Sequence, residues 1–257
     1  HRAPSRMLLA SLNVLAARER MSVGEWVPPW LRYQHEERYR FAANMAADQR
    51  VLDAACGNGY GSVLMRERGA ESVAGVDLDW DAVQQAARFH RRERVGFART
   101  SATGLPFRDA TFDLFVSLET VEHIDDDAAY VAEARRVLKQ DGTFICSTPN
   151  RAVLNPGREL RDRPFNSFHV REYTRPELEQ LLGREFRTIR WFGQSVFASW
   201  YVAFLTAIGR RLPMLAVRLH QLRKLLGALF ERRARHTPIP LPARGATEVL
   251  IAVCTNS

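Results

Sequence analysis

Cysteine is scarce in this chain of 257 residues, and its scarcity limits the kinds of site the chain can hold. The three cysteines, Cys56, Cys146 and Cys254, are widely separated, and no two of them form a Cys-x-x-Cys pair. Cysteine zinc sites and disulfide frameworks both need cysteines in closer or more regular spacing. The sequence therefore argues against both and favours a reducing compartment, so we expect a cytoplasmic protein.

Long uncharged stretches are missing as well. The best candidate, residues 196–208, is too short to cross a bilayer and is followed at once by Arg210 and Arg211. An apolar run at residues 7–17 has no cleavage pattern after it. We therefore expect neither a transmembrane helix nor a signal peptide.

Positive charge is in excess, and most of the excess lies in one segment. The formal net charge is +8. Between residues 209 and 236 a single acid, Glu231, faces eight basic residues: Arg210, Arg211, Arg218, Arg223, Lys224, Arg232, Arg233 and Arg235. Leucines recur through the same segment at helical spacing, at Leu215, Leu219, Leu222, Leu226 and Leu229. This amphipathic pattern fits a cap over an acceptor pocket, a homodimer interface or a peripheral contact with the inner membrane surface. A cap or a dimer interface is slightly favoured, because leucine stripes are more often buried against protein than against lipid.

Short apolar runs alternate with helical patterns through most of the chain. After a helix at about residues 33–47, strands are expected at 51–55, 73–77, 95–99, 112–118 and 143–147, with helices at 60–68, 81–90 and 126–139. A helix at 175–182, a strand at 186–192 and a last strand at 247–254 complete the pattern. This alternation predicts an α/β fold with a mostly parallel sheet covered by helices on both faces.

A glycine-rich loop follows the first expected strand. Its spacing from Asp53 to Gly61 is Asp-x-x-x-Gly-x-Gly-x-Gly. Glycines let the backbone turn tightly and approach a ligand where a β-carbon would clash. The acid ahead of the glycines would repel the pyrophosphate of NAD, but it would favour the cationic ammonium and sulfonium groups of S-adenosylmethionine (SAM). The loop therefore indicates a SAM site at the carboxyl end of the strand.

A second acid has the spacing of a ribose ligand. Asp77 ends the second expected strand, about twenty residues beyond the loop, where a carboxylate can accept hydrogen bonds from both ribose hydroxyls. The alternative role is capping of the next helix, for which Asp79 or Asp81 would serve equally well.

With both features present, the chain resembles the class I SAM-dependent methyltransferases over residues 33–192 and the last strand. The resemblance implies a Rossmann-like seven-stranded sheet with the last strand antiparallel and a helical insertion before it. It divides the chain into an N-terminal helical lid (1–48), a SAM-binding domain (49–194 and 246–257) and a basic amphipathic insertion (195–245). The implied SAM contacts are Asp53, Ala55, Gly57, Gly59, Asp77, Leu78, Ser101, Ala102 and Leu118. At Ser101 the family usually has aspartate, so this contact with adenine would be a weaker, neutral hydrogen bond.

A cluster of acids and histidine ends the fourth expected strand. Glu119, Glu122 and His123 would lie at the mouth of the ligand cleft, where they suit a general base or a hard divalent cation. Together with His169 they resemble the ligands of ubiquinone-pathway O-methyltransferases and small-RNA 2′-O-methyltransferases. The resemblance implies that Glu119, Glu122, His123 and His169 bind Mg²⁺ or Mn²⁺. Without a metal, His123 and Glu119 remain the candidate catalytic residues.

The acceptor expected from this pattern is a hydroxyl group, because an alcohol becomes a good nucleophile only when a base or a metal helps to remove its proton. The sequence segments around residues 26–42 and 147–151 also resemble those of bacterial methyltransferases of polysaccharide, glycolipid and glycosylated natural-product synthesis. This resemblance implies a saccharide acceptor. The alternatives are an RNA 2′-hydroxyl, a quinone or other small molecule, and a non-catalytic SAM-binding scaffold. Nucleic acid is disfavoured because the chain lacks clear interleaving of aromatic and basic residues.

Overall fold

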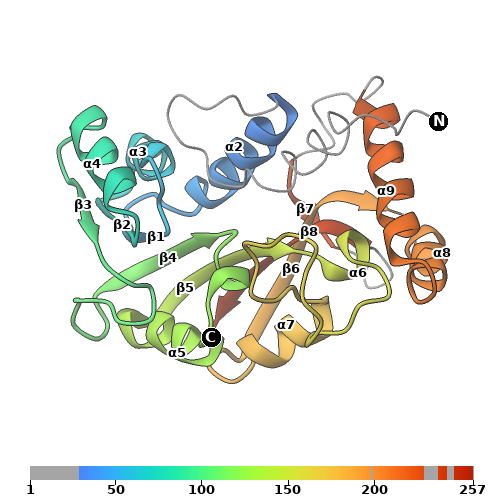
Figure 1. Cartoon of the computed structure of the whole chain (residues 1–257). Coiled ribbons are helices and arrows are strands. Elements are labelled where there is room, and N and C mark those ends of the chain that lie inside the picture. Colours follow the sequence, from blue (N-terminus) through green and yellow to red (C-terminus); the bar gives the residue numbers. More distant parts are fainter. Residues whose placement is uncertain (1–28, 198, 229–236, 242–245, 257) are drawn as a thin grey trace.

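A computed structural model describes residues 29–197, 199–228, 237–241 and 246–256. Its described residues form one eight-stranded sheet in the order β3-β2-β1-β4-β5-β8-β6-β7 (Figure 1). The strands are β1 (Arg50–Ala54), β2 (Ser72–Asp77), β3 (Val95–Arg99), β4 (Phe112–Leu118), β5 (Leu138–Pro149), β6 (Thr188–Phe197), β7 (Ile239–Pro240) and β8 (Ala246–Thr255). The helices are α2 (Pro29–Ala43), α3 (Tyr60–Glu67), α4 (Trp80–Phe89), η1 (Val121–His123), α5 (Asp127–Val137), α6 (Arg151–Leu154), α7 (Arg175–Leu182), α8 (Ser199–Gly209) and α9 (Pro213–Ala228).

The strand directions confirm the predicted α/β fold. Strands β1 to β5 pair in parallel, and β8 is antiparallel to both β5 and β6. All seven expected strands form, and the sheet is mostly parallel as predicted. The eighth strand, β7, is a two-residue addition that pairs with the β6 edge. The short length of β7 explains why no periodic pattern announced it.

Some element boundaries differ from those expected. Helix α5 ends at Val137, because Leu138 is already extended with φ −79° and ψ 140° and begins β5. Strand β6 continues to Phe197, five residues beyond the expected end. The first difference lengthens β5 where Leu138 pairs with Phe112 of β4, and the second lengthens β6 where it pairs with β8, since pairing with a neighbouring strand stabilises extended backbone.

Two hydrophobic cores flank the sheet, one on each face. Tyr39 of α2 and Met65 of α3 pack with Val51 and other strand residues on one face. Tyr130 of α5 and Leu178 of α7 pack on the other face, together with core residues of the strands. Figure 1 shows α2, α3 and α4 on one side of the sheet and α5 and α7 on the other. Burial on both faces explains why the central strands read as continuous apolar runs.

The first described helix, α2, contacts two elements that lie far from each other in the sequence, α3 and β6. It packs against α3, and the guanidinium of Arg38 donates a 2.7 Å hydrogen bond to Gln194 at the end of β6. The Gln194 amide donates in return to the main-chain oxygen of Gln34 at 3.1 Å. Because β6 runs parallel to β5, these contacts place α2 beside the carboxyl ends of the parallel strands.

The amphipathic insertion forms a helical hairpin of α8 and α9, and the predicted leucine stripe is only partly buried in it, since Leu219 packs on the α8–α9 core. Ala216 and His220 of α9 are buried, whereas Leu215 and Leu222 are 45% and 52% exposed. Helix α8 packs on a face rotated from the stripe, which leaves these leucines at the surface. Leu229 lies outside the described residues. No helix in the described part of the chain combines the length and apolar character needed to span a membrane.

Candidate active site

The glycine loop between β1 and α3 has the backbone that its sequence predicts. Ala55, Gly57 and Gly59 have φ of 60°, 53° and 79°, in the left-handed region that favours glycine. The Cys56 amide donates to the main-chain oxygen of Val76 at 3.0 Å, which fixes the loop to β2. A β-carbon on Gly59 would lie 2.6 Å from the Phe97 ring. Glycine at this position is therefore required by both conformation and space.

Gly57 differs from Gly59 in what surrounds it. A β-carbon on Gly57 would meet no described heavy atom within 4 Å. The space beside Gly57 is open, so a ligand can approach its backbone directly. This is the property expected of a loop that cradles a cofactor.

Asp53 lies beneath the loop and is fully buried. Its carboxylate accepts hydrogen bonds from the Ser62 hydroxyl at 2.6 Å and from the Tyr39 hydroxyl at 3.2 Å. Burial raises the pKa of Asp53 to about 7, although both hydrogen bonds act in the opposite direction. Asp53 thus ties α2 and α3 to the end of β1 and supports the loop from the protein side.

Asp77 faces the glycine loop and does not cap the following helix. Its two carboxylate oxygens accept from the Gly57 and Asp79 amides, each at 2.9 Å. Capping of α4 is done by Asp79, whose side chain accepts from the amides of Asp81 and Ala82. The structure thereby excludes the capping role considered for Asp77. A carboxylate has about four acceptor positions, so two remain for ligand hydroxyls.

The remaining predicted SAM contacts lie around Asp77 and at the end of β4. Leu78 is 64% exposed, which leaves an apolar side chain open next to Asp77. The Ser101 hydroxyl lies 2.8 Å from the Thr103 hydroxyl, and Ala102 packs against the core. Leu118 is buried at the last position of β4. These side chains occupy the carboxyl edge of neighbouring strands, as predicted.

Two polar residues at this edge, Arg38 and Tyr60, were not among the predicted SAM contacts. Arg38 is 2% exposed, and Tyr60 follows the last residue of the glycine loop turn. The Arg38 Nε and the Tyr60 hydroxyl are both buried and have no hydrogen-bond partner among the described residues. Burial raises the pKa of Tyr60, and the charge of Arg38 opposes this rise, so the two groups interact. A helical arginine flanked by charged neighbours looks like a solvated surface residue, and only the docking of α2 on β6 buries it.

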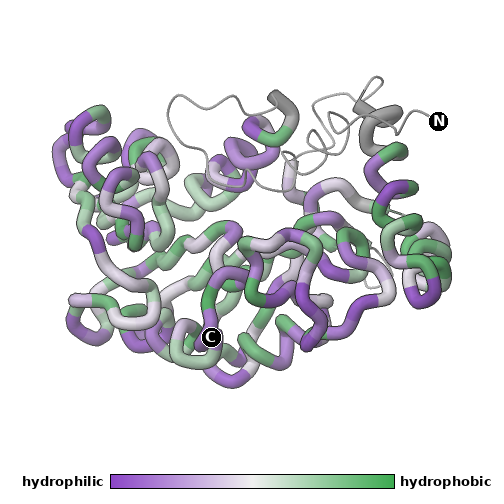
Figure 2. The backbone as a smooth tube through the Cα atoms, in the orientation of Figure 1, coloured by the Kyte–Doolittle hydropathy of each residue, from purple (hydrophilic) through white to green (hydrophobic). Residues whose placement is uncertain are grey.

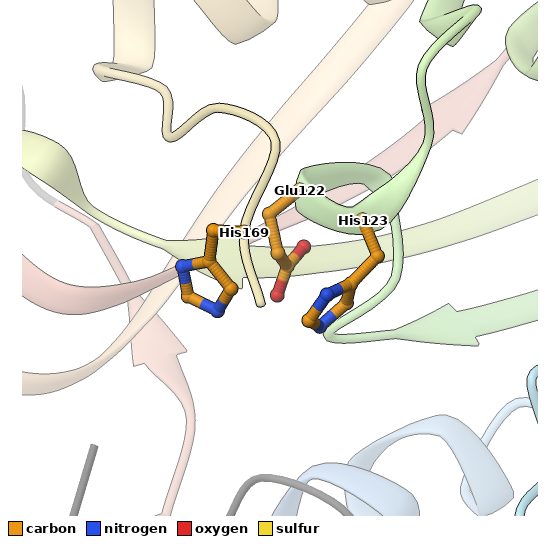
Figure 3. Close-up of side chains that lie close together, drawn as sticks. All are labelled: Glu122, His123 and His169. Atoms are coloured by element: carbon orange, nitrogen blue, oxygen red, sulfur yellow. The ribbon is translucent and has the colours of Figure 1, made fainter. Parts of the chain in front are cut away.

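The predicted acid and histidine cluster assembles in part (Figure 3). Potential ligand atoms of Glu122, His123 and His169 lie within 4.8 Å of one another. Glu119 is not part of this group; its carboxylate accepts from the Ser147 hydroxyl at 2.8 Å. Glu119 has φ 52°, an uncommon backbone state for a non-glycine residue that often marks a functional site. The predicted four-residue set is therefore a three-residue group with Glu119 held separately.

The hydrogen bonds of His169 do not suit a metal ligand. Its Nδ1 lies 2.7 Å from the Glu172 carboxylate, and its Nε2 lies 2.9 Å from the Asn166 amide nitrogen. An amide nitrogen can only donate, so Nε2 accepts and Nδ1 carries the proton. Both nitrogens are engaged by protein groups, and a metal would first have to displace Asn166. The group as arranged does not fit a divalent metal.

His123 has a different environment. Its Nδ1 lies 2.9 Å from the main-chain oxygen of Phe168, which can only accept a hydrogen bond. Nδ1 therefore carries a proton in this contact, which fixes the orientation of the His123 ring. The neighbouring Glu122 is fully buried and accepts from the Thr148 hydroxyl at 2.8 Å. The structure thus holds the His123 imidazole in one orientation at the carboxyl edge of the sheet.

Comparisons with known proteins agree with this geometry. The family described as "Methyltransferase domain" matches residues 52–146. A Mycolicibacterium smegmatis protein with the name "Probable S-adenosylmethionine-dependent methyltransferase" is 40% identical over 153 residues, which cover 60% of this chain and 57% of that protein. The ubiquinone biosynthesis O-methyltransferase of Cereibacter sphaeroides is 36% identical over 105 residues, covering 40% of this chain and 42% of that enzyme. The chain thus spans about half the length of the curated relatives it matches.

Solved structures extend the likeness to the whole fold. The crystal structure of the YcgJ protein of Bacillus subtilis has a TM-score of 0.57 and 22% identity, covering 87% of this chain and 99% of that one. The matched family region begins at β1 and contains the glycine loop, Asp77 and the Glu122–His123 pair. Residues 52–146 thus form a methyltransferase domain, and the chain resembles SAM-dependent methyltransferases in sequence and in fold.

Proposed function

We propose that this chain transfers a methyl group from SAM to a hydroxyl oxygen, with a saccharide, glycolipid or glycosylated natural product as the acceptor. The observation that carries the proposal is the position of His123, whose imidazole is oriented at the carboxyl edge by the contact of its Nδ1 with the Phe168 oxygen. The same edge holds the glycine loop. A donor site and a base therefore lie along one rim of the sheet.

The residues around the loop fit SAM. The space beside Gly57 is open, and the buried donors Arg38 Nε and Tyr60 Oη have no partner in the described structure. Buried polar groups without partners are costly, so a ligand that satisfies them gains affinity. The carboxylate of the methionine part of SAM has the charge and the oxygens that Arg38 and Tyr60 require.

The other contacts follow from the same edge. Asp77 would accept the ribose hydroxyls, with Gly57 and Gly59 offering backbone close to the ligand. The adenine ring of SAM would lie against Leu78 and Ala102, and the Ser101 hydroxyl would accept a hydrogen bond from the adenine amino group. Ala55 and Leu118 would complete the wall. Asp53 acts from beneath, because its carboxylate holds α2 and α3 against the loop.

SAM, when bound, supplies an electrophilic methyl group on its sulfonium. The task left to the protein is to align the acceptor with the methyl group and to take the hydroxyl proton. His123 Nε2 would accept that proton, and the Phe168 carbonyl would stabilise the resulting imidazolium through Nδ1. His169 packs edge-on to His123, with ring centroids 4.9 Å apart, and limits the orientations of the His123 ring.

A hydroxyl acceptor is favoured over other classes because an alcohol needs a base to take its proton, which His123 can supply. A nitrogen acceptor can attack the sulfonium methyl group with less help and has less need of such a residue. The partial likeness to an O-methyltransferase of ubiquinone biosynthesis supports oxygen as the acceptor atom. Saccharides are favoured by the sequence resemblance to bacterial glycan methyltransferases. RNA and quinone hydroxyls are the alternatives, and the presence of the complete loop, Asp77 and His123 speaks against a non-catalytic scaffold.

The experiment is to incubate the chain with methyl-labelled SAM and fractionated bacterial extracts, and to identify the labelled product by mass spectrometry and carbon NMR. We expect label in a methoxy group of a saccharide-containing fraction, with turnover unchanged by EDTA because His169 has no nitrogen ready for a metal. Label on nitrogen or carbon would contradict the proposal. Loss of turnover in EDTA with recovery in Mg²⁺ or Mn²⁺ would restore the metal hypothesis for Glu122, His123 and His169.

A further inference from the structure

A pocket of about 780 Å³, separate from the SAM site, lies between α6, α7 and the segment that joins them. Its polar lining consists of four arginines and two glutamates: Arg151, Arg158, Arg161, Arg171, Glu159 and Glu177. None of these residues belongs to the SAM site or to the acid and histidine cluster. The pocket therefore needs an explanation of its own.

Arg151 is the most buried of these arginines, at 5% exposure. Its Nη2 donates to the Glu177 carboxylate. Its Nε and Nη1 are buried and have no hydrogen-bond partner among the described residues. Arg151 lines the pocket, and these two donors of a charged group lie beneath the pocket surface without a partner in the described part of the chain.

Arg158 adds a cation that is not neutralised. It stacks over the Phe165 ring at 4.8 Å, and its Nε is buried without a partner in the described part of the chain. No described carboxylate forms an ion pair with it. The other two arginines do have acidic partners, Glu159 for Arg161 and Asp127 for Arg171. Arg158 is thus an arginine of this pocket whose charge no described carboxylate pairs with.

The chemistry of these donors suits a phosphoryl group. A phosphate offers several strong acceptor oxygens and up to two negative charges, and guanidinium groups bind it through paired, charge-assisted hydrogen bonds. Arg151 and Arg158 together offer at least three unused N–H groups. An uncharged sugar would satisfy the donors but leave the charge of Arg158 without compensation.

An apolar surface adjoins the pocket. Gly209 at the end of α8 packs backbone to backbone on the turn that precedes Arg158, since a β-carbon on Gly209 would lie 2.0 Å from the Pro156 oxygen. The α8–α9 turn that follows exposes Leu212, Met214 and Leu215 by 58%, 52% and 45%. The neighbouring Arg210 and Arg211 are exposed as well. Figure 2 shows α8 as mostly hydrophobic and α9 as an alternation of hydrophobic and hydrophilic positions.

We propose that the arginine pocket binds the phosphoryl group of a lipid, whose apolar part lies against the α8–α9 turn. Exposed leucine and methionine side chains flanked by arginines are what an anionic lipid surface requires of a protein. The pocket wall includes Val170, directly after His169. If the proposed function holds, the lipid is the carrier of the acceptor saccharide, and its headgroup reaches the edge where His123 lies.

The test compares vesicles of phosphatidylcholine alone with vesicles that also contain phosphatidic acid, in flotation assays of the whole chain. We expect the chain to float with the phosphatidic acid vesicles and not with the neutral ones. Arg158→Gln should lower the bound fraction about tenfold or more, because it removes a charge-assisted contact. Arg187→Gln, an exposed arginine at the start of β6, is the matched control and should bind as the unaltered chain does.

Three outcomes would overturn the inference: flotation with neutral vesicles to the same extent, equal losses in the two variants, and absence of flotation. Calorimetric titration with inorganic pyrophosphate distinguishes the source of the phosphoryl group. Binding of pyrophosphate that Arg158→Gln abolishes, without any flotation, would assign the pocket to a soluble phosphate and refute the lipid. Binding of S-adenosylhomocysteine, measured on the same samples, reports separately on the proposed function.

Discussion

The two halves of the sheet's carboxyl edge are built in different ways. Around β1 and β2 the polar contacts are short in sequence: Asp53 bonds Ser62 nine residues away, and Gly57 bonds Asp77 twenty residues away. Around β4 and β5 they are long, since His123 bonds the Phe168 oxygen across 45 residues. The donor half is mostly a contiguous motif, apart from Arg38, whose contact with Gln194 spans 156 residues. The acceptor half exists only after the chain has folded, so its specificity can change without disturbing the donor half.

The comparison predicts that damage to the glycine loop is the most severe. Gly59→Val would force a β-branched residue into φ 79° and place its β-carbon 2.6 Å from the Phe97 ring. We expect affinity for S-adenosylhomocysteine to fall by more than about a thousandfold, given the strain of such a residue in the left-handed region and the ring clash. Calorimetry would measure this. Gly96→Val, where the added side chain meets open space, is the control and should bind normally.

A change in the acceptor half should leave the donor half intact. His123→Gln removes the base, so we expect kcat to fall by about 10²- to 10⁴-fold. S-adenosylhomocysteine should bind with unchanged affinity, and His90→Gln at the end of α4 should have neither effect. A loss of cofactor affinity in His123→Gln equal to its loss of turnover would show that the two halves are not independent.

The buried acid of the donor half predicts a pH dependence of stability. The pKa of Asp53 is raised from 3.8 to about 7, so the folded state retains a proton that the unfolded state loses between these values. Stability from this group is fully present below about pH 4 and is lost as the pH rises through 7. Between these limits the unaltered chain should lose up to about 4 kcal/mol more than Asp53→Asn. Urea unfolding at several pH values measures the difference, and parallel curves for the two proteins would refute the assignment.

Loss of the ribose contact is expected to have a smaller effect than damage to the glycine loop or loss of His123. Asp77→Asn keeps the shape of the side chain but replaces charge-assisted acceptors with one neutral acceptor and a donor. We expect affinity for S-adenosylhomocysteine to fall about ten- to a hundredfold. Asp81→Asn, in the exposed first turn of α4, serves as the control. Equal affinities for Asp77→Asn and the unaltered chain would remove Asp77 from the site.

The smallest effect is a gain. Ser101 replaces the aspartate usual in related enzymes, and its hydroxyl lies against Thr103. Ser101→Asp should raise affinity for S-adenosylhomocysteine by a few-fold, because the adenine amino group would donate to a charged acceptor. Inosine-type analogues lacking that amino group should show no gain. An identical gain for both ligands would place the adenine elsewhere.

The same division explains what the sequence could predict. The β1 loop, the strand that ends in Asp77 and the succession of strands along the chain follow from local spacing and apolar periodicity, and the structure contains them. The burial of Arg38 depends on Gln194, 156 residues away, and the bonds of His169 to Asn166 and Glu172 depend on the path of a loop. Leu215 and Leu222 lie on the surface because α8 covers another face of α9. Periodicity reveals that a helix has an apolar side, but not which neighbour covers it.

The central claim is that SAM occupies the carboxyl edge of β1 and β2. A crystal structure of the chain with S-adenosylhomocysteine tests it most directly. The account predicts that the ribose hydroxyls lie within hydrogen-bond distance of Asp77, the carboxylate meets Arg38 and Tyr60, and the sulfur points toward His123. A ligand bound at another edge of the sheet, or Asp77 and Arg38 with the same surroundings as in the free chain, would contradict it.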